Sequence, residues 1–203
     1  NGRTKLVILP FAHEFKWLSC AEDVYEKYDR CPRATESIFW RTVKPFTDIG
    51  IDANNIVVIN HFADPVELIK HKLLADNTIV YLPGGRPENI MKILQRLKLI
   101  ETIKKCKIVV GESAGSMIWS KRYFVYPDAD YKRYKAYKGL GVIKDCVFIP
   151  HFQLTGGYDH IVRSARRFNW LHKDTIYLVE DGGWIHYNTT RKTILKRKNA
   201  IRY

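Results

Sequence analysis

Residues 108–117, IVVGESAGSM, join an apolar run to a Gly-Glu-Ser-Ala-Gly segment, and a stretch able to form a helix follows. The run is rich in Val and Ile, which predicts a buried strand. Small residues on both sides of Ser113 allow a sharp strand-to-helix turn that would push the serine hydroxyl outward. The same residues also fit a serine whose only role is to let the backbone bend. The rest of the sequence is needed to choose between a nucleophile and a purely structural serine.

Five other apolar runs resemble the one before Ser113, and most are apolar throughout rather than alternating. Strands covered on both faces have this pattern, which favours a parallel sheet. With 107–111, the predicted strands are 6–9, 56–59, 78–82, 146–149 and 175–179. Segments with helical periodicity lie between them, at 35–48, 64–74, 87–105, 114–120 and 159–171. The alternation predicts an α/β fold, a three-layer α/β/α sandwich with a mostly parallel sheet.

Local signals refine several of these elements. Asp64-Pro65-Val66-Glu67 matches a capping box that opens a helix, and Pro87 marks the first turn of another. Pro45 is expected to end or kink the helix at 35–48. The segment 121–141 is polar and rich in Tyr, which predicts a loop. The last segments, WIHYN, KTILKR and AIRY, predict a terminal β-meander.

Length and composition limit the class of protein. The chain has 203 residues, of which 46% are hydrophobic, so a single domain over residues 1–203 is expected. No apolar run reaches the 18 residues of a membrane span, and the apolar stretch near the start is too short for a signal peptide. The four scattered cysteines form no CxxC pair, which predicts reduced thiols, a cytoplasmic location and no zinc site.

The net charge of +13 raises the question of nucleic-acid binding. The basic residues are spread along the whole chain, however, and no known nucleic-acid-binding motif accompanies them. A solvated basic surface is therefore favoured over nucleic acid as a partner. A basic surface would also favour acidic substrates. The net charge alone does not distinguish a solvated surface, nucleic-acid binding and acidic substrates.

Chemically useful residues follow four of the predicted strands. In open α/β sheets, ligands bind beyond the carboxyl ends of the strands. At these ends lie Pro83-Gly84-Gly85-Arg86, Glu112-Ser113-Ala114-Gly115, Pro150-His151-Phe152 and Glu180-Asp181-Gly182-Gly183. Each segment alone has an ordinary structural explanation as a turn, hairpin or surface histidine. Together they predict a catalytic site at one edge of the sheet.

The residue types at this edge fit nucleophilic catalysis. A serine needs a nearby base, and a histidine needs a carboxylate to orient its ring. The N–H of Ala114 would face a developing oxyanion, and Gly84-Gly85 could bring a second backbone N–H close. An α/β-hydrolase would use a similar serine motif. Its order of serine, acid and histidine does not fit here, because no histidine follows His186.

The segments LPGGRPENIMKIL, VVGESAGSMI, FIPHF and LVEDGGWI resemble, in order and spacing, the aspartyl dipeptidase (peptidase E) and cyanophycinase family of serine peptidases. The resemblance runs from about Lys5 to the C-terminus and is most specific over 78–187. It implies a class I glutamine amidotransferase-like fold, of flavodoxin-like type, with no metal or organic cofactor. It also implies cleavage of short peptides, notably those with an N-terminal aspartate, or of cyanophycin.

The resemblance assigns roles to individual positions. The nucleophile falls on Ser113 and the base on His151. The acid falls on Asp181 with Glu180 as its competitor, and a further aspartate of the dipeptidases falls on Asp128. Gly85 and Ala114 would form the oxyanion hole, while substrate binding falls on Gly84 and Arg163.

Two departures from the family pattern concern the substrate. Glu112 precedes the nucleophile where the family often has an aromatic or small residue, and 121–141 lacks the dipeptidase-like sequence. A carboxylate beside the serine would disfavour an acidic substrate, or it would point to the far side of the sheet. The sequence therefore predicts a serine peptidase acting on short peptides, with dipeptides as one expected substrate. The alternative is a non-catalytic relative that binds an acidic ligand or nucleic acid, and a homodimer is one assembly left open.

Overall fold

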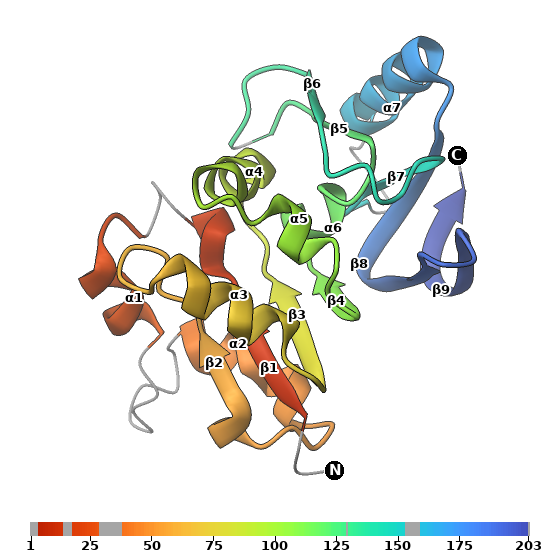
Figure 1. The fold of residues 1–203 in the computed structure, drawn as a ribbon. Helices are drawn as coiled ribbons and strands as arrows, with labels where there is room; N and C mark the ends of the chain where they lie inside the picture. The colour runs from red at the N-terminus through yellow and green to blue at the C-terminus, as the bar shows by residue number, and fades with distance from the viewer. Residues whose placement is uncertain (1–3, 14–17, 29–37, 129, 153–158, 203) are drawn as a thin grey trace. The chain divides into compact units, whose positions relative to one another are not determined.

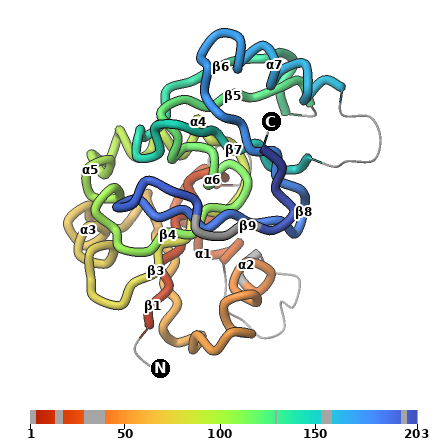
Figure 2. Tube along the Cα trace, turned by 90° about the vertical axis from the view of Figure 1, so that its right-hand side faces the viewer, coloured from red at the N-terminus to blue at the C-terminus, as the bar shows by residue number. Residues whose placement is uncertain are grey.

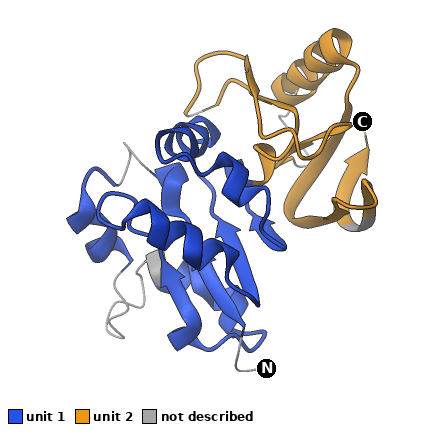
Figure 3. Ribbon diagram, viewed as in Figure 1, with its two compact units in different colours: residues 1–115 blue, residues 116–203 orange. Residues whose placement is uncertain are grey.

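The computed structural model describes residues 4–13, 18–28, 38–128, 130–152 and 159–202. The chain forms two compact units, Asn1–Gly115 and Ser116–Tyr203 (Figure 3). The expectation of one domain over residues 1–203 stays a prediction.

The first unit is built on a parallel sheet of four strands in the order β2-β1-β3-β4 (Figure 1). Figure 2 shows α2 on one side of these strands and α3 and α5 on the other. The elements are β1 (Lys5–Ile8), the 3-10 helix η1 (Pro10–His13), α1 (Ala21–Lys27), α2 (Ile38–Thr47), the 3-10 helix η2 (Ala53–Asn55), β2 (Ile56–Val58), α3 (Val66–Leu74), β3 (Thr78–Leu82), α4 (Pro87–Arg96), α5 (Ile100–Ile103) and β4 (Ile108–Gly111).

The second unit contains a hairpin and a three-stranded sheet in the order β7-β8-β9, in which β7 and β8 are parallel and β9 is antiparallel. Its elements are β5 (Arg122–Val125), β6 (Lys135–Lys138), β7 (Cys146–Ile149), α7 (Asp159–His172), β8 (Thr175–Asn188) and β9 (Thr193–Arg202). Helix α6 (Ala114–Met117) lies at the junction of the two units in the sequence. The predicted α/β fold with a mostly parallel sheet and helices on both faces is confirmed.

Apolar burial explains why β1 and β3 are continuous hydrophobic runs in the sequence. On the α2 side, Leu6 and Ile8 of β1 and Tyr81 of β3 pack with Val43 and Phe46 of α2, and all five are buried. On the other faces of β1 and β3, Val7, Val80 and Leu82 are buried as well. Burial on both faces is what a helix-covered parallel sheet requires.

The prediction of a buried strand before Ser113 was wrong in its burial, because Ile108 and Val110 of β4 are 54% and 38% exposed.

Several local predictions were wrong in detail. Helix α3 begins at Val66 with Pro65 as its N-cap, and Asp64 instead accepts a hydrogen bond from the Asn60 N–H at 3.0 Å. Pro45 lies inside α2, which continues to Thr47, while the first residues of the predicted 35–48 helix lie outside the described part.

The predicted helix at 87–105 is divided into α4 and α5. Lys98 takes a left-handed conformation with φ of 53°, and the Leu99 N–H donates to the Leu94 carbonyl at 2.8 Å. This is the helix-ending geometry usually supplied by glycine. Because Leu99 is fully buried, packing of the residue after the turn offsets the strain at Lys98.

The segment predicted as a loop, 121–141, contains the β5–β6 hairpin. The predicted terminal meander consists instead of two long antiparallel strands, β8 and β9. Helix α6 is also shorter than expected, since it ends at Met117 rather than 120.

Three cysteines lie in the described residues, Cys20, Cys106 and Cys146, and none of them forms a disulfide. Over the same residues, no helix has both the length and the apolar character needed to cross a membrane.

Candidate active site

Ser113 occupies a strained turn directly after β4. The Glu112 N–H donates to the Leu82 carbonyl at 2.9 Å, and the Glu112 carbonyl then accepts from the Gly115 N–H at 2.7 Å, which closes the turn. Ser113 has φ of 47°, in the left-handed region that side chains with a Cβ rarely adopt. Such strain persists where the surrounding structure imposes it, and it is frequent at functional sites.

Gly115 explains the second glycine of the Gly-Glu-Ser-Ala-Gly segment. A Cβ on Gly115 would overlap the Leu82 carbonyl oxygen and lie 2.8 Å from the Leu82 Cβ. Only a residue without a side chain lets α6 begin this close to the end of β3. Ala114 is the first residue of α6, and an N–H at that position has no acceptor within its own helix.

The Gly84-Gly85 pair follows β3, the strand that neighbours β4. A Cβ on Gly84 would lie 3.2 Å from the Ser113 Cβ, so this glycine borders the serine directly. Gly85 has φ of 133°, and a Cβ there would lie 2.8 Å from the Ala12 carbonyl oxygen. The backbone of residues 84–85 is thus held between η1 and the Ser113 turn.

In the second unit, the side chains of His151 and Asp181 are hydrogen-bonded. His151 follows β7 with φ of 60°, and its Nδ1 lies 2.7 Å from the Asp181 Oδ1. Both side chains are more than half exposed. Because a carboxylate accepts from an N–H, this contact favours the tautomer with the proton on Nδ1 and leaves Nε2 as the basic nitrogen.

A β-bulge directs Asp181 toward His151. Between the pairs Val179–Ala200 and Trp184–Lys198, four residues of β8 stand opposite one residue of β9. Extra residues in one strand release side chains from the ladder and redirect them. The sequence predicted that a strand ends at 179, whereas the Glu-Asp-Gly-Gly segment is a bulge inside β8.

The other predicted site residues have their own surroundings. Asp128 is exposed, and its Oδ1 accepts from the N–H groups of Asp130 and Tyr131 at 2.8 Å each, so it holds the turn between β5 and β6. Glu180 is half-buried in the bulge next to Asp181, and Arg163 is exposed on α7.

No group of three or more His, Cys, Asp or Glu side chains suited to a metal ion is found among the described residues.

Comparison with known proteins now identifies the family. The model of peptidase family S51 matches residues 32–195. The chain belongs to peptidase family S51. It is therefore a serine peptidase.

Solved structures similar to this S51 peptidase show the same fold. A protein named as a candidate peptidase E from Listeria monocytogenes EGD-e is 17% identical with a TM-score of 0.61, over 100% of this chain and 87% of that one. A peptidase from an acI-B1 actinobacterium is 16% identical with a TM-score of 0.56, over 98% of this chain and 74% of that one. The class I glutamine amidotransferase-like fold expected from the sequence is confirmed. None of the curated proteins matches the chain significantly.

Sequence reasoning missed Tyr81 of the S51 peptidase. Its hydroxyl donates a hydrogen bond to the Glu112 carboxylate, from inside an apolar strand. Burial and the bond to Glu112 both raise the pKa of Tyr81, so it stays a hydrogen-bond donor at neutral pH. The sequence signal was the tyrosine hydroxyl in the mostly apolar run TIVYL. Only the β3–β4 register, which pairs Tyr81 with Val110, brings this hydroxyl to Glu112.

Proposed function

We propose that this S51 peptidase hydrolyses short peptides, dipeptides among them, through an acyl-enzyme on Ser113. His151 takes the hydroxyl proton on Nε2 while Oγ attacks the scissile carbonyl carbon. The resulting oxyanion accepts hydrogen bonds from the N–H groups of Gly85 and Ala114. His151 then protonates the leaving amine, whose departure leaves the acyl ester. A water, deprotonated by His151, attacks this ester and releases the acid.

The observation that carries this proposal is the 2.7 Å contact between His151 Nδ1 and Asp181 Oδ1. A carboxylate on Nδ1 is the arrangement that prepares a histidine to act as a general base through Nε2. The left-handed turn at Ser113, bordered by Gly84, supports the serine as its partner in the reaction. In this scheme Asp181 orients the ring, and Glu180 and Asp128 are the alternatives.

A fluorophosphonate probe tests the assignment, because it reacts only with an activated serine. We expect labelling at Ser113, lost in Ser113→Ala and strongly reduced in His151→Ala. Ser116→Ala is the matched control, since Ser116 lies three residues further along in α6, and its labelling should equal that of the wild type. Labelling that survives Ser113→Ala would refute the proposal. A protein that never labels but binds nucleic acid in a strongly salt-dependent way would favour the non-catalytic alternative.

The substrate length and the role of Arg163 belong to the same proposal. Arg163 is exposed on α7, and a guanidinium can hold a carboxylate through two parallel hydrogen bonds. We therefore propose Arg163 as a contact for a carboxylate of the substrate. Arg163→Gln should raise KM for peptide acids and leave KM for the corresponding peptide amides unchanged. The cytoplasmic location and the homodimer stay predictions.

A further inference from the structure

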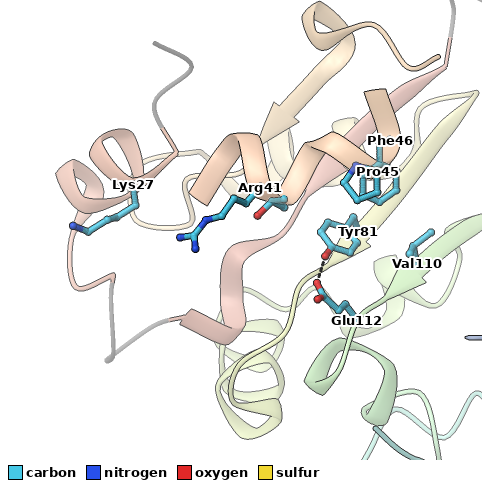
Figure 4. A pocket seen from close by; sticks show the side chains of 8 residues that line it. Lys27, Arg41, Pro45, Phe46, Tyr81, Val110 and Glu112 are labelled. Carbon is cyan, nitrogen blue, oxygen red and sulfur yellow. Dashed lines mark hydrogen bonds between the residues drawn. The ribbon is translucent and has the colours of Figure 1, made fainter. Parts of the chain in front are cut away.

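A pocket of about 790 Å³ lies on the α2 side of the first unit's sheet, beside the turn that carries Ser113 (Figure 4). This volume is in the range that holds small ligands. Residues from α1, α2, β3, β4 and the turn after β4 line it: Lys27, Arg41, Thr42, Pro45, Phe46, Tyr81, Val110 and Glu112.

The walls next to Glu112 are largely apolar. The rings of Phe46 and Tyr81 pack edge to face with centroids 5.0 Å apart, and Val110 and Pro45 complete this part of the pocket. Such walls suit a chain of methylene groups, and aromatic faces also attract a cation.

Among the described residues that line the pocket, Glu112 is the only acid. Its side chain is exposed, whereas Tyr81, which donates to it, is only 6% exposed. The carboxylate is thus anchored from the buried side. A carboxylate accepts several hydrogen bonds, so one bond from Tyr81 leaves capacity for a cationic group of a ligand.

Two cations line the other end of the pocket. Arg41 and Lys27 extend away from the Tyr81–Glu112 pair (Figure 4). Their charges would repel a cation placed there, so a single cationic head is best accommodated at the Glu112 end. An acidic side chain would meet the opposite situation, because it would face the Glu112 carboxylate.

The pocket is connected to the proposed nucleophile by the chain itself. Glu112 directly precedes Ser113, and consecutive Cα atoms are ~3.8 Å apart. This adjacency is what would bring the side chain of a peptide residue to the pocket when its carbonyl meets Ser113.

We propose that this pocket is a specificity site for a lysine or arginine side chain of the peptide, with Glu112 binding its cationic head and Tyr81 positioning Glu112. The proposal rests on Ser113 being the nucleophile. It gives the enzyme a preference for a basic residue next to the scissile bond, rather than an acidic one.

Three dipeptides test the preference: Lys-Leu, norleucyl-leucine, which lacks the ammonium group, and Asp-Leu. We expect kcat/KM for Lys-Leu to exceed that for norleucyl-leucine by about 10- to 100-fold, with Asp-Leu the poorest. Glu112→Gln should lower kcat/KM for Lys-Leu toward that for norleucyl-leucine, and Glu112→Lys should favour Asp-Leu. A wild type that prefers Asp-Leu would overturn the proposal, as would a Glu112→Gln variant that slows all three substrates equally.

Two further measurements separate this proposal from that of the nucleophile. Fluorophosphonate labelling of Ser113 at the wild-type rate in Glu112→Gln would show that the reacting serine is intact. Calorimetric binding of Lys-Leu to Ser113→Ala, compared with Ser113→Ala/Glu112→Gln, tests the pocket without any turnover. Weaker binding in the double variant supports the pocket even if Ser113 never labels, and equal binding overturns it. Tyr81→Phe keeps the ring and should cause a smaller loss of the preference for Lys-Leu, which provides a second variant if Glu112→Gln does not fold.

Discussion

The Nδ1 atom of His151 lies 2.7 Å from the Oδ1 atom of Asp181, and a bulge in β8 is what brings the two side chains together. His151 follows β7, which pairs with β8 in parallel, and the Phe152 N–H extends this pairing by donating to the Val179 carbonyl at 3.1 Å. The histidine therefore stands next to the bulge, where the released Asp181 side chain can reach its ring.

This contact leads to a prediction about Asp181. Replacing it by asparagine keeps the size but removes the charge that stabilises the protonated ring and fixes its tautomer. We expect kcat of Asp181→Asn to fall by about 10³- to 10⁴-fold, with a small change in KM. The matched variant is Glu180→Gln, one residue away in the same bulge, which should retain most of its activity. Steady-state kinetics on a peptide that the wild type hydrolyses efficiently distinguishes the two variants. A larger loss of kcat in Glu180→Gln than in Asp181→Asn would assign the role to Glu180.

Asp128 is predicted to contribute chiefly to the turn between β5 and β6. Its carboxylate accepts from two backbone N–H groups, and alanine would remove both bonds. Asp128→Ala should lower the free energy of unfolding by about 1 kcal/mol, measured by urea denaturation. Asp128→Asn keeps the accepting oxygen, so we expect it to retain both stability and kcat. A large loss of kcat in Asp128→Asn, with stability unchanged, would instead show that the charge takes part in catalysis.

The Ser113 turn could be predicted from sequence because its determinants are local. Small residues around the serine, after an apolar run, are enough to indicate a strand-to-helix turn, and its φ of 47° agrees with that expectation. The strands β1 and β3 were also predictable, because burial on both faces leaves a continuous apolar run.

Features that depend on tertiary structure were missed. The Glu-Asp-Gly-Gly segment has the composition of a turn, yet it is a bulge, because β9 supplies a partner strand on both sides of it. The β5–β6 hairpin escaped notice because β6 is mostly exposed and polar, while Tyr123, Phe124 and Val125 of β5 are buried. The Tyr81–Glu112 bond joins two strands, and no local pattern predicts it.

Burial of ionisable groups predicts a loss of stability at alkaline pH. Burial raises the pKa of the Cys106 thiol to about 11 and that of Cys146 to about 12, above the ~8.5 of an unfolded thiol. Above pH ~8.5 the unfolded chain releases these protons while the folded chain keeps them, so the free energy of unfolding decreases as pH rises. The raised pKa of Tyr81 acts in the same direction at higher pH. Melting temperatures should therefore fall between pH 8 and pH 11.

Cys106→Ala is the test of this origin. It removes one of the groups responsible, so its melting temperature should depend less steeply on pH than that of the wild type. Equal pH dependence in both proteins would show that Cys106 does not contribute.

The last prediction concerns the close approach of α6 to the end of β3. In Gly115→Ala, the new Cβ would overlap the carbonyl of Leu82, a backbone group that no side-chain rotation can move away. Overpacking of this kind costs about 1–3 kcal/mol, and here it also displaces the Ser113 turn. Gly50→Ala is the matched control in the same unit, because Gly50 has φ of 95° but nothing within 4 Å of its Cβ position. We expect both variants to lose stability in urea, whereas only Gly115→Ala should also lose fluorophosphonate labelling at Ser113. Full labelling of Gly115→Ala would mean that the turn does not depend on this contact.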